Sequence, residues 1–268
     1  MAHQLRYPPL VEALLEIKWN LKQIAPDAYR DEGYKWANGR LYDKIKKRFG
    51  HIKELPTAMI PEEIAAYTVR HQFRATENGW PLVQFGPGIA TVNFTPPYSW
   101  SEFKGAVKFF IPKLVEAYQG VVQEQALVAS SAALRYINGI QLDWSVNSTL
   151  EYLSDKLHTI ITLPEGISAD ELISGTPVNI NLQVGYPTSE PNGQAIVRVS
   201  NGTVGQSKGL ILEILFVSAG NHAPQFTDTD NFMIWLTSAH DVIERWFFTL
   251  IEGELESQFK GEDVNGQN

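Results

Sequence analysis

Hydrophobic and polar residues alternate along several stretches of the chain, with the period of two that is typical of half-buried β-strands. The first stretch, residues 10–19, places Ala13, Leu15 and Ile17 on one face and charged residues on the other. The same pattern predicts strands at residues 64–74, 80–85, 89–95, 133–144, 178–184, 195–200 and 210–218. Asn78-Gly79 and Asn192-Gly193 are typical hairpin turns between them.

Apolar residues spaced three or four apart predict helices in the intervening segments. These helices cover residues 28–49, 99–118, 148–161 and 230–256, with a short helical turn near 168–171. Ser99 and Ser148 each precede a Glu by three residues, which is the pattern of a helix-capping box. Pro112 lies inside the second helix, where we expect a kink or a break.

The elements follow the order strand, helix, three strands, helix, and the order occurs twice. We therefore predict an α+β fold of duplicated β-α-β-β-β-α units, a mostly antiparallel sheet with helices packed on one face. The halves are residues 1–125 and 126–258, followed by an acidic flexible tail, residues 259–268. A TATA-binding-protein-like layout is an analogy at the level of fold. The pattern leaves open whether the halves share one sheet.

If helices cover one face, the other displays polar side chains of both charges. By strand parity these are Glu12, Glu16, Lys18, Arg70, Gln72, Arg74, Arg135, Gln141, Asp143, Asn179, Asn181, Gln183, Arg198 and Glu213. Such a face can hold a polar ligand or a partner protein, although a solvated face with cross-strand ion pairs is the more common explanation. As candidate binding residues we select Glu12, Glu16, Arg70, Arg74, Arg135, Asn138, Asp143 and Arg198.

Composition narrows the class of protein. The 268 residues are 44% hydrophobic, enough for a sizeable core, and none is cysteine, which excludes disulfides and thiolate chemistry. No apolar segment is long enough for a signal or a membrane span, so we expect a cytoplasmic protein. The net charge of −8 disfavours nucleic acid as the main partner, although residues 40–53 form a basic cluster that could contact phosphates.

Motifs with chemical meaning are weak in this sequence. Gly205-Gln206-Ser207-Lys208-Gly209 matches the letters of a nucleophile elbow, but strands are predicted on both sides, so a hairpin loop explains it better. His240 and Glu244 are one helical turn apart, and we interpret them as a surface pair because two ligands make a weak metal site. His71 lies on an apolar strand face and is interpreted as a core histidine. We therefore predict no catalytic residue, metal or cofactor.

Three motifs together carry a resemblance: Pro8-Pro9-Leu10-Val11-Glu12-Ala13, then Leu134-Arg135-Tyr136-Ile137-Asn138, then Ala239-His240 in a late helix. The chain resembles a sporadically distributed prokaryotic family of uncharacterised proteins of about this length. That family usually has a basic residue after the central Asn, where this chain has Gly139. The resemblance implies a shared fold and special roles for Glu12, Glu16, Arg135 and Asn138. Its patchy distribution is compatible with mobile or defence-associated genes.

Three functional hypotheses remain from the sequence. The first, which we favour, is a non-enzymatic binding protein whose protein or polar small-molecule partner uses the polar sheet face or the groove between the halves. The second is an enzyme whose site is assembled between the halves, for example from Glu12, Arg135 and Asp143. The third is a nucleic-acid-binding protein that uses the sheet face and the basic cluster. A homo-oligomer is compatible with each.

Overall fold

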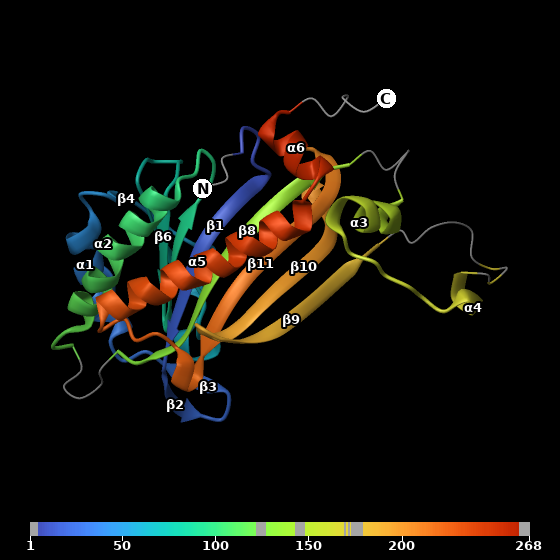
Figure 1. The fold of residues 1–268 in the computed structure, drawn as a ribbon. Coiled ribbons are helices and arrows are strands. Elements are labelled where there is room, and N and C mark those ends of the chain that lie inside the picture. The colour runs from blue at the N-terminus through green and yellow to red at the C-terminus, as the bar shows by residue number, and fades with distance from the viewer. Residues whose placement is uncertain are drawn as a thin grey trace.

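The computed structural model describes residues 5–121, 127–142, 148–168, 170, 172 and 179–262. In these ranges nine strands form one sheet in which every neighbouring pair is antiparallel (Figure 1). In sheet order the strands are β4 (His51–Glu54), β5 (His71–Arg74), β6 (Leu82–Gly86), β7 (Ile89–Phe94), β1 (Leu10–Trp19), β8 (Ala129–Gln141), β11 (Ser207–Ala219), β10 (Asn192–Val204) and β9 (Asn181–Ser189). The predicted α+β class with an antiparallel sheet is confirmed.

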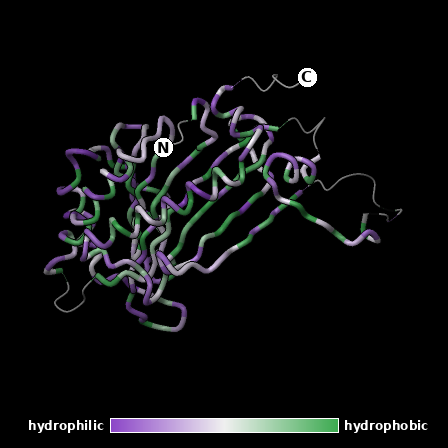
Figure 2. Tube along the Cα trace, in the orientation of Figure 1, coloured by the Kyte–Doolittle hydropathy of each residue, from purple (hydrophilic) through white to green (hydrophobic). Residues whose placement is uncertain are grey.

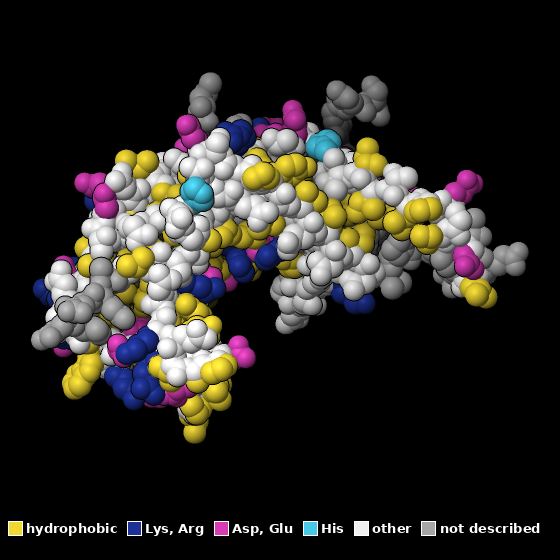
Figure 3. Space-filling model, turned by 90° about the horizontal axis from the view of Figure 1, so that it is seen from below, with side chains coloured by type: hydrophobic (Ala, Val, Ile, Leu, Met, Phe, Trp, Pro, Cys, Tyr) yellow, Lys and Arg dark blue, Asp and Glu magenta, His cyan; other side chains and the backbone are white. Residues whose placement is uncertain are grey.

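Helices cover one face of this sheet. Figure 1 shows α1 (Tyr34–Ile45), α2 (Trp100–Tyr118), α3 (Thr149–Leu157) and α5 (Thr229–Ile251) in front of the strands. The short α6 (Glu254–Lys260) follows α5, and α4 (Glu165–Ser168) stands apart from the body. Figure 3 shows that the opposite side of the sheet, which we call the open face, is hollowed and carries Lys and Arg side chains. A hairpin of β2 (Lys22–Ala25) and β3 (Ala28–Arg30) forms a separate sheet.

The two halves of the chain meet in the middle of the sheet, where β1 pairs with β8. On one side of this pair follow β7, β6 and β5, and on the other side follow β11, β10 and β9. On each side of the β1–β8 pair, the last strand of that half lies next to the pair and the earlier strands follow outward in reverse order. The first half has one additional strand, β4, at its edge. We call the β1–β8 pairing the seam. The division near residue 125 falls outside the described residues and stays a prediction.

The core lies between the sheet and the helices. The alternation in β1 buries Ala13, Leu15 and Ile17 completely or almost completely beneath the helices. Phe110 of α2 and Leu236 of α5 pack into the same layer without exposure to solvent. Figure 2 shows hydrophobic residues concentrated on the central strands. Burying a side chain of this size contributes about 1.5–3 kcal/mol, so this layer dominates the stability of the fold.

Several predicted boundaries are wrong. The first helix begins at Tyr34 because residues 22–30 form the β2–β3 hairpin. Most of the predicted strand 64–74 is irregular: a 3-10 helix (Glu62–Ile64) ends at its first residue, Tyr67 is left-handed (φ 58°), and β5 begins only at His71. Another 3-10 helix, Pro56–Met59, lies before this stretch. The predicted hairpin turn at Asn192-Gly193 is also displaced. The turn before β10 is at residues 190–191, and Asn192 already pairs with Ser189.

The helix predictions also need correction. Pro112 does not break α2, since one helix runs from Trp100 to Tyr118 with buried side chains around the proline. The last predicted helix is two helices, because Gly253 adopts φ 93° between them. Phe259 and Lys260, predicted to begin the flexible tail, instead end α6, and the Phe259 side chain is buried.

Candidate functional site

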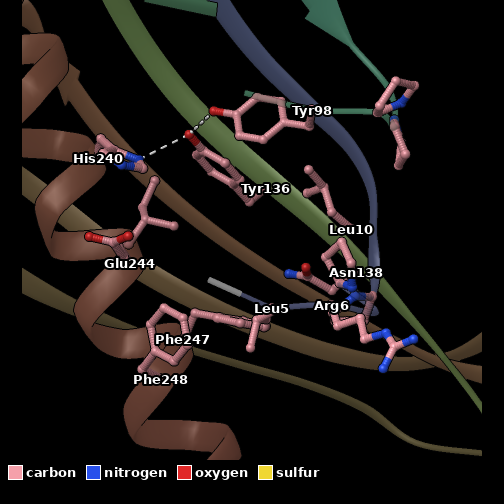
Figure 4. Close-up of a pocket in the computed structure, with 15 residues that line it drawn as sticks. Leu5, Arg6, Leu10, Tyr98, Tyr136, Asn138, His240, Glu244, Phe247 and Phe248 are labelled. Atoms are coloured by element: carbon pink, nitrogen blue, oxygen red, sulfur yellow. Dashed lines mark hydrogen bonds between the residues drawn. The ribbon is translucent and has the colours of Figure 1, made fainter. Parts of the chain in front are cut away.

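A cavity of about 480 Å³ opens at the seam, on the helix-covered side of the sheet (Figure 4). Five parts of the chain line it: the segment before β1, the first residue of β1, the β7–α2 connection, β8 and α5. The lining residues are Leu5, Arg6, Pro8, Pro9, Leu10, Pro96, Pro97, Tyr98, Tyr136, Asn138, His240, Ile243, Glu244, Phe247 and Phe248. We call this space the seam cavity. Both halves of the chain contribute to it, as the hypothesis of a groove between halves requires.

A chain of three hydrogen-bonding side chains lies along one side of the seam cavity. The hydroxyls of Tyr98 and Tyr136 are 2.5 Å apart, and the Tyr136 hydroxyl is 3.0 Å from Nδ1 of His240. Figure 4 shows these three side chains converging from the β7–α2 connection, β8 and α5. Strand alternation explains the position of Tyr136, because it shares the helix-facing side of β8 with buried Leu134.

His240 is fixed by packing as well as by its hydrogen bond. Its ring stacks on Trp100, the first residue of α2, with the ring centroids 3.8 Å apart. Only 9% of His240 is exposed, and this burial lowers its pKa to about 4. The imidazole is therefore neutral at neutral pH, and one ring nitrogen carries the proton while the other accepts.

Both tyrosines are also uncharged at neutral pH. Burial raises the pKa of Tyr98 and of Tyr136 well above the ordinary value for tyrosine, and the nearby Glu244 carboxylate raises both further. A chain of neutral groups can run in either direction. If Tyr136 donates its hydrogen bond to His240, Tyr98 donates to Tyr136 and presents an oxygen lone pair to a ligand. If His240 donates to Tyr136 instead, Tyr136 donates to Tyr98, and the Tyr98 O–H is available to a ligand. The chain can thus serve a donor or an acceptor.

The rest of the seam cavity is mainly apolar. Its walls are Leu10, the Pro96-Pro97 pair, Ile243, Phe247 and Phe248. Asn138 contributes a buried amide, which donates to the carbonyl of Leu212 at 3.3 Å. Arg6 lies at the exposed rim with its guanidinium 5.3 Å from the centre of the Tyr7 ring. The cavity therefore combines apolar walls with a few polar groups from opposite sides of the seam.

The structure places most of the predicted site residues elsewhere. Asn138 is the one member of the predicted set that lines the seam cavity. Glu12, Glu16, Arg74, Arg135 and Arg198 take part in polar contacts among strands of the open face. Asp143 lies outside the described residues. The five residues on the open face are therefore separated from the cavity by the thickness of the sheet.

On the open face, Glu213 of β11 joins two arginines. Nη1 of Arg198 donates to Oε1 of Glu213 at 3.0 Å, and Nε of Arg198 donates to Gln183 at 2.7 Å. Nε of Arg135 lies 3.1 Å from the same Glu213 oxygen without the alignment of a hydrogen bond. Nearby, Glu12 accepts from the Asn93 amide at 2.7 Å. These are the cross-strand pairs that the simpler interpretation of this face predicts.

Arg70 does not belong to the exposed polar face, which corrects the prediction from strand parity. Its side chain is buried, donates to the carbonyls of Ala58 at 3.4 Å and Ile60 at 2.8 Å, and lies 5.9 Å from the centre of the Tyr34 ring. Parity fails here because the chain is irregular before His71. Arg70 therefore anchors the connection between β4 and β5 instead of facing a partner.

The remaining motifs resolve in different ways. Gly205 and Gln206 form the two-residue turn between β10 and β11, so the hairpin interpretation is confirmed. His71 is partly buried, and its Nδ1 lies 2.8 Å from the Tyr34 hydroxyl, so its hydrogen bonding is satisfied although it is not a fully buried core residue. The interpretation of His240 as a surface residue is wrong, because α5 turns it into the core. Among the described residues, no three His, Asp or Glu side chains are placed to hold a metal ion.

The basic cluster at residues 40–53 packs largely against its own chain. Arg40 donates to the carbonyl of Gln119 at 2.8 Å, and Lys44 pairs with Glu116 at 3.0 Å. Arg48 lies 5.7 Å from the centre of the Phe109 ring and donates to the carbonyl of Gly105. These three cations therefore tie α1 and the residues after it to α2.

No protein-family model and no curated protein matches this sequence. The resemblance to an uncharacterised prokaryotic family therefore stays a prediction. Within the described residues, every helix is too short or too polar to cross a membrane.

Proposed function

We propose that this chain is a binding protein and that the seam cavity holds a small, mainly apolar molecule with one hydrogen-bonding group. The observation that carries the proposal is the neutral Tyr98–Tyr136–His240 chain at the side of a cavity whose walls are mainly apolar, with Arg6, Asn138 and Glu244 as its other polar lining residues. Ligand sites in proteins typically have volumes of about 300–1,000 Å³, apolar walls and a few placed polar groups, and they favour boundaries between structural units. The seam cavity has each of these properties.

The protonation states favour binding over acid–base catalysis. An efficient general acid or base has a pKa near the working pH, whereas burial moves the pKa of His240 down and the pKa values of Tyr98 and Tyr136 up. Each group thus keeps its proton state through the neutral range. This supports the use of the chain for recognition by hydrogen bonds, and it makes an enzyme the weaker alternative.

Nucleic-acid binding is the other alternative. It would use the hollow open face, where Arg135 and Arg198 share the carboxylate of Glu213. Phosphate contacts require cations that can leave their present partners, and three cations of the basic cluster are held by α2. We therefore rank this function below ligand binding at the seam.

A ligand-observed NMR screen tests the proposal on the full chain, with small compounds that carry an alcohol, amide, amine or carboxylate group and with purely apolar compounds. We expect hits whose affinity falls by tenfold or more in Leu10→Trp, because the indole would occupy the cavity that Leu10 lines. Tyr98→Phe should weaken the hits that carry a hydrogen-bonding group and leave purely apolar hits unchanged. Tyr152→Phe on α3 is the matched control, since Tyr152 is outside the cavity lining.

Two results would contradict the proposal. One is a screen in which no compound binds the wild-type chain. The other is a set of hits whose affinities are the same in Leu10→Trp and Tyr98→Phe as in the wild type and the control. A correctly folded Leu10→Trp variant, verified by its circular dichroism and its urea midpoint, is required for either comparison.

A further inference from the structure

The two edges of the nine-stranded sheet differ in how they are protected. The edge strand β4 has four residues, among them Lys53 and Glu54, and short, charged edges resist pairing with other chains. The opposite edge strand β9 has nine residues and no charged side chain, and most of its residues are exposed. Within the described residues β9 pairs only with β10, so its outer edge is a template for another strand.

The usable part of this edge is defined by Pro187. Proline has no N–H to donate, so a ladder on the outer edge of β9 is favoured for the six residues before it, Asn181–Tyr186. On the helix-facing side of this segment, Val184 and Tyr186 are 38% and 58% exposed. Tyr186 packs edge-on against Trp246 of α5 at 5.8 Å, which places an apolar surface directly beside the open edge.

A second apolar feature follows α3. We give the name arm to residues 158–168 together with Asp170 and Leu172. Figure 1 shows the arm leaving α3 and reaching α4, which stands away from the body. Ile160 is 78% exposed and Leu172 is 92% exposed, with Leu163 and Ile167 also exposed. Figure 2 shows hydrophobic colouring along this extended segment.

We propose that β9 and the arm form a two-fold interface with a second copy of this chain. The β9 strands of the two copies pair antiparallel, which joins both sheets, and each arm packs on Val184 and Tyr186 of the other copy. A two-fold axis brings identical surfaces together and makes identical strands antiparallel. One symmetric contact thereby covers both an open strand edge and an arm that extends beyond its own sheet.

The open edge of β9 and the exposed apolar side chains of the arm together favour a second copy of the chain over a peptide as the partner. A peptide added to β9 would cover the strand edge and leave the apolar side chains of the arm exposed. In the symmetric arrangement each arm meets the apolar surface beside the other β9, and β9 brings no charge that would repel its copy. The two segments supply roughly 20 residues from each copy, which is the number expected on one side of a stable interface.

Analytical ultracentrifugation of the full chain over a concentration series tests this proposal. We expect a species with twice the mass of the 30.1 kDa chain. Val184→Lys places a charge at the edge, and Leu172→Asp places one on the arm, so each should weaken the dimer at least tenfold. Met59→Asp is the matched control, because Met59 is 89% exposed on another part of the surface. A monomer at every concentration, or a dimer unaffected by both variants, would overturn the proposal.

The absence of cysteine permits a second measurement that does not depend on destabilising variants. Near a two-fold axis between antiparallel strands, a residue and its own copy approach closely enough for a disulfide. Gln183→Cys and Val184→Cys are therefore made separately, and mild oxidation should give rapid disulfide-linked dimer in at least one of them. Met59→Cys supplies the background rate of an exposed thiol. Equal rates in all three variants would also count against the interface.

Discussion

Tyr98 and Tyr136 connect the two halves of the chain through a hydrogen bond of 2.5 Å between their hydroxyls. Tyr98 follows β7 in the first half, and Tyr136 lies on β8 in the second. Their rings meet edge to face with centroids 5.7 Å apart. Because Tyr136 also contacts Nδ1 of His240, one side chain links the first half, the central sheet and α5 at the seam cavity.

Tyr136→Phe should therefore destabilise the protein more than Tyr98→Phe. The first substitution removes the hydroxyl that both partners use and leaves Nδ1 of His240 buried without a protein partner, which costs about 2 kcal/mol. The second keeps the bond between Tyr136 and His240 and should cost about 1 kcal/mol. Urea unfolding of the two variants measures the difference. Equal costs would mean that the bond to His240 contributes little.

The lowered pKa of His240 predicts that stability falls in mild acid. The pKa is 6.5 in an ordinary environment and about 4 in the folded chain, so the unfolded chain binds the proton more tightly. The contribution of His240 to the free energy of unfolding is complete above pH 6.5, decreases as the pH falls, and is lost near pH 4. Each pKa unit corresponds to about 1.4 kcal/mol, so the loss approaches about 3 kcal/mol.

Urea unfolding at pH 7 and at pH 4.5 tests this dependence in the wild type and in His240→Gln. The glutamine amide can still accept from Tyr136 but does not titrate, so the variant should lose less stability on acidification. Some pH dependence should remain, because burial also lowers the pKa of His71. An unchanged loss in the variant would show that His240 is not the titrating group.

Much of the fold follows from the hydrophobic pattern because strand parity depends on neighbouring residues alone. In β1 the pattern assigned Ala13, Leu15 and Ile17 to the buried face, and these are buried. The order of elements is also local information. Parity failed before His71, where a 3-10 helix that ends at Ile64 and the left-handed Tyr67 take the place of the expected strand. Conformations of this kind depend on distant contacts, such as that of Arg70 with the carbonyl of Ile60.

The site was harder to predict because its residues are far apart in the sequence. Tyr136 and His240 are separated by 104 positions and meet only when α5 packs on β8. The spacing of His240 and Glu244 did identify one face of α5, but two ligands make a weak metal site, so the two were interpreted as a surface pair. The remaining signal in the sequence is a tyrosine on the inward face of a strand. A buried hydroxyl requires a hydrogen-bond partner, but the sequence does not show which residue supplies it. Asn138 entered the predicted set through the resemblance alone.

Arg70→Ala should open the connection between β4 and β5 and leave the seam cavity intact. The substitution removes charged hydrogen bonds to Ala58 and Ile60, and bonds to charged groups contribute about 1.5–3 kcal/mol. Amide hydrogen exchange should rise across residues 55–64 while β8 and α5 keep their protection. Arg74→Ala is the matched control, because Arg74 bonds mainly to Gln72 and Gly79 near its own strand. Similar exchange in both variants would contradict the anchoring role.

Asp31→Asn should be the most destabilising polar substitution in the first half. Oδ2 of Asp31 accepts from Nε1 of Trp19 at 2.9 Å, from the Tyr118 hydroxyl at 2.8 Å and from the backbone N–H of Gly88 at 3.0 Å. Oδ1 accepts from the N–H of Gly33 at 3.0 Å. An asparagine amide has one acceptor oxygen, so at least one of these buried donors would lose its partner.

The expected cost is about 3 kcal/mol, because Asp31 is 7% exposed and three of its four donor residues, Trp19, Gly33 and Gly88, are buried. Glu32→Gln is the matched control: Glu32 is adjacent, but its pair with Lys22 is partly exposed, so its loss should cost less than about 1 kcal/mol. Urea midpoints of the two variants decide the matter. Equal midpoints would mean that the hairpin β2–β3 and α2 are held together by apolar packing and not by the Asp31 carboxylate.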